Sequence, residues 1–120
     1  MVFVALQESA DRGELILVRD GMLRYRVRKD GVLTIREILV LPFRRRTGLG
    51  TQLLQELAMK HPENKFRATC PVKYIEANLF WASQGFRIAK QVEGLNVWER
   101  ESWAFLNSSG VQTGTNPTPT

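Results

Sequence analysis

Cysteine and histidine are almost missing from this sequence, and their scarcity excludes several kinds of site. The 120 residues include one cysteine, Cys70, and one histidine, His61. A single cysteine cannot form an internal disulfide, and it fits a reducing compartment. Zinc sites draw on clustered cysteine and histidine ligands, and a Ser-His-Asp triad needs a histidine held in place. We therefore predict no metal site and no triad.

Long apolar runs are also missing. No stretch approaches the ~18 residues that suggest a membrane-spanning helix, and the first residues lack the basic region of a signal peptide. We therefore expect a cytoplasmic protein without a membrane partner. The chain length fits one domain with a real core, which we assign to residues 1–106. Residues 107–120 carry no charge and almost no apolar side chains, so we predict a disordered tail.

Negative charge is in short supply. The 17 lysines and arginines exceed the 12 acidic residues, which gives a net charge of +5 and a pI of about 9.9. Such a balance favours an anionic partner, which leaves nucleic acid, an acidic substrate and a polyphosphate cofactor open. Part of the excess lies in one predicted strand, where Arg24, Arg26 and Arg28 alternate with apolar residues and share a face.

Alternation, apolar periodicity and turn residues predict a mixed order of strands and helices. Asp20-Gly21 and Asp30-Gly31 are typical of hairpin turns, and Pro42 ends the most apolar strand. Hairpins combined with β-α-β units indicate an α+β domain with a mixed sheet. We expect strands over 2–7, 15–18, 22–28, 32–41, 66–69, 86–92 and 95–101, and helices from Gly48 or Gly50 to Lys60 and over about 72–84.

The segment Arg45-x-x-Gly48-x-Gly50 stands between a strand and a helix. Glycines allow close approach of the backbone to a ligand, and a helix N-terminus presents free N–H groups and a positive dipole end. That arrangement suits a phosphate or pyrophosphate. The P-loop is excluded because no Gly-Lys pair occurs, and the dinucleotide fingerprint is excluded because Leu53 replaces its third glycine.

This segment resembles the acyl-CoA-binding motif of the GCN5-related N-acetyltransferase (GNAT) family, Gln/Arg-x-x-Gly-x-Gly/Ala. A second segment, with Phe80, Trp81, Gly85 and Phe86, resembles that family's Phe-Tyr-x-x-x-Gly-Phe helix. The resemblance implies a mixed sheet splayed at its centre, flanking helices, and acyl-CoA in the split. Because only residues 8–13 separate the first two predicted strands, the N-terminal helical region is shortened relative to the family.

The resemblance implies transfer of an acetyl group from acetyl-CoA to a primary amine. It places the pantetheine arm beside Leu39, Val40 and Leu41, where a backbone N–H near Val40 would polarise the thioester carbonyl. The implied pyrophosphate site comprises Arg45, Arg46, Thr47, Gly48, Leu49, Gly50 and Thr51. Asn78 and Trp81 are candidates for contacts with the cosubstrate; the alternatives are a solvent-facing asparagine and a core aromatic residue.

Two residues are candidates for proton transfer. Glu37, on the central predicted strand, matches a position where several family members keep a glutamate that acts as a base. The alternative is a salt bridge to an arginine of the neighbouring strand, such as Arg26. Trp81 occupies the position where many members have a tyrosine acid, and an indole N–H cannot act as a general acid. Tyr74 or water would then protonate the thiolate.

Two other functions stay open. The arginine stripe favours a nucleic-acid-binding module, although the sequence has no aromatic stacking pattern and no recognised binding motif. The loss of the tyrosine favours a CoA-binding protein with the GNAT fold and little catalysis. For an acetyltransferase, the short N-terminal region leaves an open groove for a peptide or small-molecule amine, or is completed by a homodimer partner.

Overall fold

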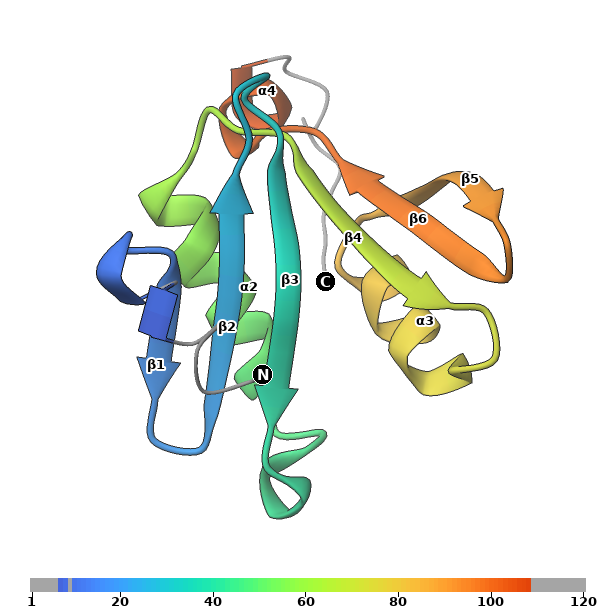
Figure 1. Cartoon of the computed structure of the whole chain (residues 1–120). Helices are drawn as coiled ribbons and strands as arrows, with labels where there is room; N and C mark the ends of the chain where they lie inside the picture. The colour runs from blue at the N-terminus through green and yellow to red at the C-terminus, as the bar shows by residue number, and fades with distance from the viewer. Residues whose placement is uncertain (1–6, 9, 109–120) are drawn as a thin grey trace.

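The computed structural model describes residues 7–8 and 10–108, which form a six-stranded sheet with helices packed on it (Figure 1). The predicted strand at 2–7 lies outside the described residues except for Gln7, which is helical. Of the predicted tail, residues 107 and 108 end a helix and the rest is not described. The elements are β1 (Leu15–Val18), β2 (Gly21–Val27), β3 (Leu33–Val40), a 3₁₀ turn η1 (Pro42–Arg44), α2 (Leu49–Lys60), β4 (Phe66–Pro71), α3 (Ile75–Ser83), β5 (Arg87–Val92), β6 (Leu95–Arg100) and α4 (Trp103–Ser108).

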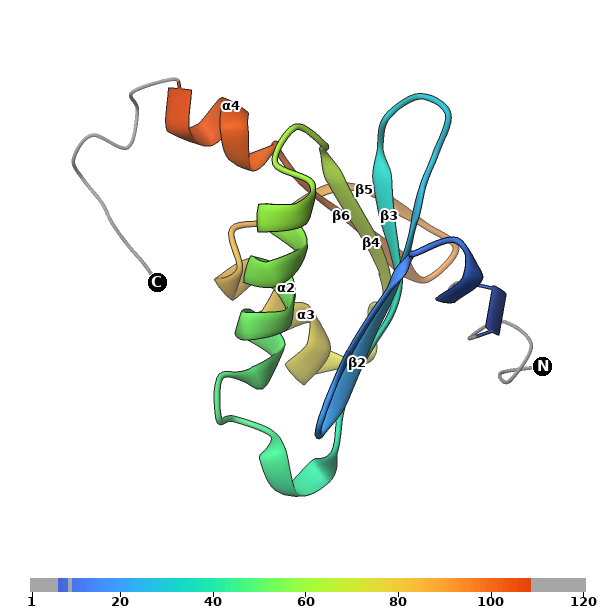
Figure 2. The same cartoon turned by 90° about the vertical axis from the view of Figure 1, so that its left-hand side faces the viewer.

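The sheet is mixed, as the sequence predicts. Its strand order is β1-β2-β3-β4-β6-β5. Only β3 and β4 run parallel among the described strand pairs; the hairpins and the β4–β6 pair are antiparallel. Helix α2 connects the two parallel strands, as a β-α-β unit requires. Helices α2 and α3 lie on the same face of the sheet (Figure 2), which leaves most of the other face open.

The sheet splits between β3 and β4. The two strands pair only from Leu33 with Phe66 to Ile35 with Ala68, and then diverge (Figure 1). On the other side of β3, Glu37 faces Arg24 and Ile35 faces Tyr25, so Arg36 is an extra residue in the β2–β3 ladder. Such a bulge bends a strand and increases its twist. The divergence therefore begins where the bulge changes the course of β3.

The core lies between the sheet and α2. Five α2 residues at helical spacing are buried, as the apolar pattern predicts, and the helix packs on β2 and β3. They are Leu49, Leu53, Leu54, Leu57 and Ala58. From β3, Leu33 and Ile35 are buried, and Ile38 and Val40 pack against the same core. The core-facing positions of β3 therefore change from odd to even residue numbers. The bulge explains this change, because one extra residue turns the side chains that follow it to the opposite face of the sheet.

The second helix begins later than predicted. Residues after Pro71 first form a turn, in which Tyr74 N–H donates to Pro71 O at 3.1 Å, and α3 starts at Ile75. Val72 N–H donates to Gly94 O at 2.9 Å in the β5–β6 turn, which ties this segment to the sheet before the helix can form. Gly85 follows the helix with φ +86°, the conformation expected of a terminating glycine. The short α4 was not predicted.

Candidate functional site

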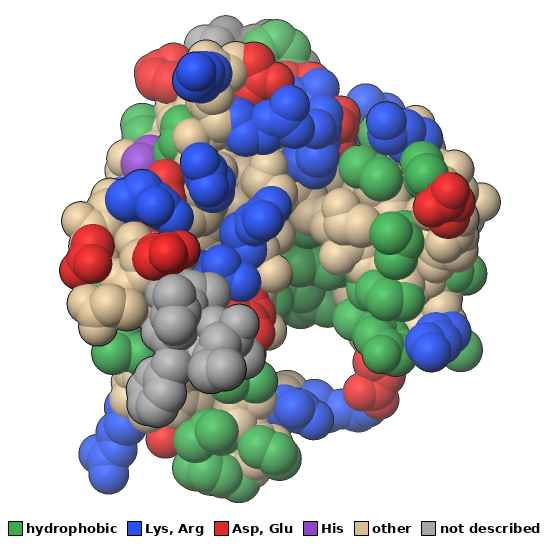
Figure 3. Space-filling model, viewed as in Figure 1, with side chains coloured by type: hydrophobic (Ala, Val, Ile, Leu, Met, Phe, Trp, Pro, Cys, Tyr) green, Lys and Arg blue, Asp and Glu red, His purple; other side chains and the backbone are tan. Residues whose placement is uncertain are grey.

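A cleft of about 630 Å³ lies on the helix side of the split, within the range of small-molecule sites. It brings together the end of β3, the arginine loop, the first turn of α2 and one side of α3. In the space-filling view the split is an open gap between the two parts of the sheet (Figure 3). The cleft is lined by Ile38, Leu39, Val40, Arg44, Arg45, Arg46, Gly48, Gly50, Thr51, Glu76, Ala77, Leu79, Phe80, Trp81, Ser83 and Gln84.

The end of β3 turns one backbone edge toward this cleft. Leu41 N–H donates to Asp20 O at 2.9 Å, on the β2 side. Because N–H groups alternate between the two edges of a strand, those of Val40 and Ile38 face the split. Arg45 agrees with this direction, since its Nε donates to Val40 O at 3.2 Å. The strand therefore offers backbone donors and acceptors to a ligand between β3 and β4.

The N-terminus of α2 is uncapped. Gly48 is its N-cap residue with φ 88°, and no described side chain caps the helix. The hydrogen bond from Gln52 N–H to Gly48 O, at 3.0 Å, is the first of the helix, so the N–H groups of Leu49, Gly50 and Thr51 precede the ladder. A Cβ on Gly48 would meet no atom within 4 Å, so the backbone conformation requires the glycine and the space beside it is open. This end of the helix is suited to an anion.

Gly50 has a packing role in addition to the one its motif suggests. A Cβ at position 50 would lie 3.0 Å from Cε1 of Phe80 and 3.1 Å from its Cζ. The glycine therefore lets α2 approach the aromatic side of α3 closely. The sequence interpretation assigned both glycines to ligand approach, and the structure gives Gly50 a packing role as well.

The arginine loop is held by its own contacts. Arg44 pairs with Asp20 at 2.6 Å, and Thr47 donates its hydroxyl to Arg44 O. Arg46 reaches the first turn of α3, where its Nη2 lies 2.9 Å from a carboxylate oxygen of Glu76. Both of these side chains are more than four-fifths exposed, at 84% and 81%. Arg46 and Glu76 thus connect the two sides of the cleft through a solvent-accessible ion pair.

Several lining residues had no assigned role at the sequence level. Gln84 donates to Thr51 Oγ1 at 2.9 Å and so joins α3 to α2, and Ser83 donates to Phe80 O at 2.7 Å. The only signal for these residues was their place in the second family-like segment. Their contacts depend on how α2 and α3 pack, which a local motif does not describe.

Asn78 lies outside the cleft, and its amide is fully engaged with the protein. Its Nδ2 donates to Pro71 O at 2.9 Å and to Tyr74 O at 2.7 Å. Its Oδ1 accepts from Asn96 Nδ2 and from Trp98 Nε1, each at 2.9 Å. Both amide atoms are already hydrogen-bonded within the protein, so Asn78 links α3 to β6, and its contact with pantetheine stays a prediction.

Trp81 and Tyr74 occupy contrasting places. Trp81 is 5% exposed and packs edge-on between Phe80 and Phe86, with ring centroids 5.2 Å and 5.0 Å away. It is a core residue that also lines the cleft. Tyr74 is 53% exposed at the start of α3 and does not line the cleft. The candidate acid therefore lies away from the groups that would hold the thioester.

Glu37 lies on the open side of the sheet. It faces Arg24, a residue that alternates with the buried Leu23 and Tyr25, and the two side chains pair at 3.3 Å. The sequence suggested Arg26 as the salt-bridge partner; in the observed register Arg26 faces Thr34, and Arg24 takes this place. About 40% of the Glu37 side chain is exposed, so it is accessible to an incoming molecule.

His61 and Cys70 do not line the cleft and contact residues of the fold instead. Tyr25 Oη lies 3.0 Å from His61 Nε2 and donates to Gly13 O at 2.9 Å. Burial lowers the pKa of His61 from 6.5, and it raises the pKa of the buried Cys70 thiol.

Within the described residues no three His, Cys, Asp or Glu side chains cluster as metal ligands. In the same part of the chain, no helix is both long enough and apolar enough to span a bilayer.

Comparison with solved structures shows related folds. A GNAT acetyltransferase from Bacillus cereus has a TM-score of 0.72 and 19% identity, over 81% of this chain and 76% of that one. The PaiA N-acetyltransferase from Thermoplasma acidophilum, in complex with coenzyme A, has a TM-score of 0.72 and 11% identity over 83% and 69%. Arabidopsis thaliana Naa50 with the bisubstrate analogue CoA-Ac-MVNAL has a TM-score of 0.54 and 19% identity over 68% and 65%.

The sequence comparison identifies the family. No curated protein matches the chain. Residues 1–88, more than half of the sequence, match the family described as the acetyltransferase (GNAT) domain. Both family-like segments lie within this range, and the splayed mixed sheet is the one that the resemblance implies. The chain therefore belongs to the GNAT family of acetyltransferases.

Proposed function

We propose that this protein binds acetyl-CoA in the cleft beside the β3–β4 split and transfers the acetyl group to a primary amine. One observation carries the proposal: the uncapped N-terminus of α2 and the cleft-facing backbone edge of β3 open into the same cavity. The first suits a pyrophosphate and the second suits an amide-containing arm. The coenzyme A complexes of proteins with the same fold support this choice.

The residues fit the cosubstrate from one end of the cleft to the other. The N–H groups at the start of α2, together with Arg45 and Arg46, would hold the pyrophosphate. The backbone of Ile38 and Val40 would hydrogen-bond the pantetheine arm. Bound acetyl-CoA supplies an activated acyl group, and an N–H near Val40 would stabilise negative charge on its carbonyl oxygen.

The reaction needs two proton transfers, one from the acceptor amine and one to the departing thiolate. An acceptor amine is mostly protonated at neutral pH and must lose a proton before it attacks. Glu37 is the candidate base, since it is accessible on the open face and lies one residue from Ile38, which lines the cleft. Trp81 cannot donate the proton to the departing thiolate. Because Tyr74 lies outside the cleft, we assign that step to water.

Isothermal titration with acetyl-CoA and CoA tests the binding step. We expect binding by the unaltered protein and about a hundredfold weaker binding by Gly48→Glu, which sets a carboxylate beside the pyrophosphate site. Gly31→Glu is the matched control, because Gly31 has the same φ of +88° and open space around it but lies in a turn outside the cleft. Absence of heat with the unaltered protein would refute the proposal.

Thiol release tests the transfer step. Acetyl-CoA is mixed with a panel of polyamines, amino acids, aminoglycosides and peptides, and free thiol is followed over time. Acetylation of one class identifies the acceptor chemistry. Tight CoA binding without thiol release from any amine would instead support a CoA-binding protein with little catalysis, in line with the tryptophan at position 81.

A further inference from the structure

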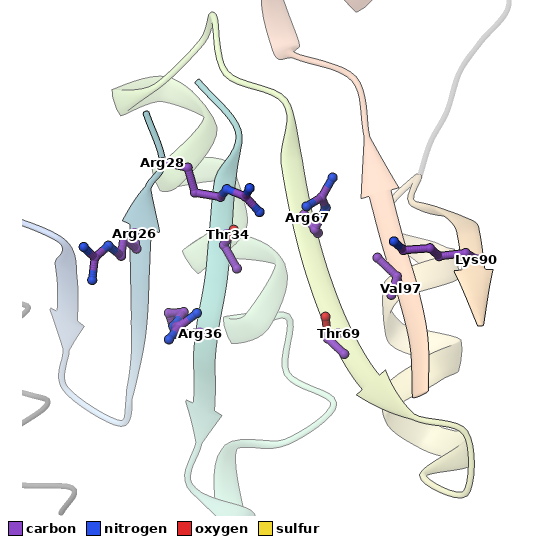
Figure 4. Close-up of a pocket in the computed structure, with 8 residues that line it drawn as sticks. All are labelled: Arg26, Arg28, Thr34, Arg36, Arg67, Thr69, Lys90 and Val97. Carbon is purple, nitrogen blue, oxygen red and sulfur yellow. The ribbon is translucent and has the colours of Figure 1, made fainter. Parts of the chain in front are cut away.

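The open face of the sheet carries a basic concavity of about 480 Å³ (Figure 4). Two threonines and a valine complete its lining, which contains no carboxylate. Figure 4 shows Arg28 extending over β3 and Lys90 extending over β6, from opposite sides. The other face of the same strands holds the core, with residues such as Tyr25, Ile35 and Ala68. The cations that line the concavity are Arg26, Arg28, Arg36, Arg67 and Lys90.

Much of this positive charge is not neutralised. Arg67 pairs with Glu99 at 2.7 Å, and Arg28 pairs with Asp30 at 3.4 Å. Arg26, Arg36 and Lys90 make no ion pair with any carboxylate among the described residues. Several like charges around one hollow repel one another and attract an anionic ligand.

A polar group in the same hollow also lacks a partner. The hydroxyl oxygen of Thr34 is buried and has no hydrogen-bond partner among the described residues. A buried hydroxyl without a partner is costly, and a bound carbonyl or carboxylate would supply one. Free cations and an unpartnered hydroxyl therefore point to the same kind of ligand.

The concavity adjoins the split in the sheet. Arg36 and Thr69 are the first residues beyond the last β3–β4 pair, Ile35 with Ala68, and both line the concavity. Ile38, two residues further along β3, lines the cleft on the helix side. At about 3.3 Å per residue, the two cavities meet the same strand about 7 Å apart. A molecule on the basic face can thus present a group to the split.

We propose that the basic concavity binds an acidic peptide whose amine is the acetyl acceptor; this inference rests on the proposed function. The lining extends from β2 to β5, which are four strand spacings apart in the sheet. At about 4.8 Å each they span roughly 19 Å, more than a small amine can reach. An extended peptide of about six residues covers that distance. The lining has no aromatic side chain on which nucleic-acid bases could stack, which favours the peptide.

A pair of peptides tests the inference. Both carry a free α-amine and a central lysine; one has glutamates at the neighbouring positions and the other has glutamines. We expect kcat/KM for the acidic peptide to exceed that for the neutral peptide about tenfold at low salt, and the ratio to shrink as salt screens the charges. Equal kcat/KM values for the two peptides would overturn the inference.

Matched charge variants locate the effect. Arg36→Gln with Lys90→Gln removes two unpaired cations of the concavity, and we expect the acidic-to-neutral ratio to fall about fivefold. Arg19→Gln with Lys60→Gln removes the same charge at exposed positions outside the concavity and should preserve the ratio. A ratio that falls equally in both double variants would mean that net charge alone matters, and would overturn the site.

Binding without acetyl-CoA separates this inference from the proposed function. Fluorescence anisotropy of the labelled acidic peptide should show binding that weakens in the Arg36→Gln, Lys90→Gln variant. Peptide binding without acetyl transfer would support the acidic-peptide surface and count against the proposed function. Acetyl transfer to both peptides without preference would support the proposed function and count against the acidic-peptide surface. A labelled single-stranded oligonucleotide that binds more tightly than the acidic peptide would overturn the choice of ligand.

Discussion

Gly50 and Phe80 are in close contact: a Cβ at position 50 would lie 3.0 Å from Cε1 of Phe80, so the ring would have to shift by a few tenths of an ångström to admit it. The Phe80 ring is itself held edge-on against Trp81, at a centroid distance of 5.2 Å. A shift of the Phe80 ring would therefore change its contact with the buried Trp81. The contact fixes the separation of α2 and α3, the two helices that line the cleft.

Gly50→Ala should therefore destabilise the fold. Alanine is the better helix former by up to ~1 kcal/mol, but overpacking typically costs about 1–3 kcal/mol, so we expect a net loss of about 1 kcal/mol in chemical denaturation. Phe80→Leu relieves the clash, so the double variant should lose less than the sum of the two single variants. A gain in stability for Gly50→Ala alone would show that the ring adapts freely.

Asn78→Asp should destabilise the protein by about 2 kcal/mol, because a carboxylate cannot donate to Pro71 O and Tyr74 O and sets a negative charge beside both carbonyl oxygens. Urea unfolding measures the loss. Asn64→Asp is the control, since Asn64 donates to a single carbonyl, that of Gly31, in an exposed hydrogen bond. Normal stability with a selective loss of CoA binding would instead support the pantetheine contact implied by the family resemblance.

The contrast between α2 and Asn78 shows how far local sequence reaches. The α2 stripe was predictable because burial follows the helical period, and all five of its apolar positions are buried. The role of Asn78 depends on Asn96 and Trp98, which lie 18 and 20 residues away on another element. No local pattern encodes those partners. The family resemblance suggested a ligand contact, and the hydrogen bonds indicate a structural one.

Strand register was the second limit. Alternation correctly predicted β2 and β3 but not the extra residue at Arg36, because a bulge leaves little trace in a short apolar pattern. Without that residue the ladder that pairs Tyr25 with Ile35 would set Glu37 opposite the buried Leu23, so the bulge is what makes Glu37 face Arg24. The backbone of the loop from Arg45 to Gly50, in contrast, was predictable, since strand end, glycine conformation and helix start are all local. Its uncapped helix follows from the lack of a capping side chain at Gly48.

Glu76→Gln should strengthen CoA binding about threefold at low salt. Glu76 is a carboxylate at the margin of the proposed pyrophosphate site, and it holds Arg46 in an exposed ion pair. Removing its charge frees the guanidinium for phosphate and removes a repulsion, while exposed pairs of this kind contribute only about 0–1 kcal/mol. Titration calorimetry measures the change, with Glu56→Gln on an exposed part of α2 as the control. Weaker binding by Glu76→Gln would mean that Glu76 positions Arg46 productively.

Glu37→Gln should lower kcat for acetyl transfer by about a hundredfold or more, with the Kd for CoA nearly unchanged, if Glu37 is the general base. Arg24→Gln is the companion variant, because it removes the ion-pair partner and leaves the carboxylate in place. We expect it to retain most of the activity. Loss of stability in both variants together with unchanged kcat would assign Glu37 to the sheet alone.

His61 provides a prediction for the pH dependence of stability. Burial lowers the pKa of its imidazole from 6.5, and the charge of Lys60 lowers it further, while Glu14 raises it. Since the folded pKa lies below the unfolded value, the unfolded chain takes up a proton first as the pH falls. The contribution of neutral His61 is therefore complete above about pH 6.5 and is lost as the pH falls through the folded pKa.

The unfolding temperature of the unaltered protein should accordingly fall more steeply on acidification than that of His61→Gln, from about pH 7.5 to about pH 5. Circular dichroism at constant ionic strength measures both curves, and the comparison cancels the carboxylates that the two proteins share. Tyr25→Phe tests the environment, because it removes the hydroxyl 3.0 Å from Nε2 while keeping the ring. Parallel curves for the unaltered protein and His61→Gln would show that the imidazole titrates equally in both states.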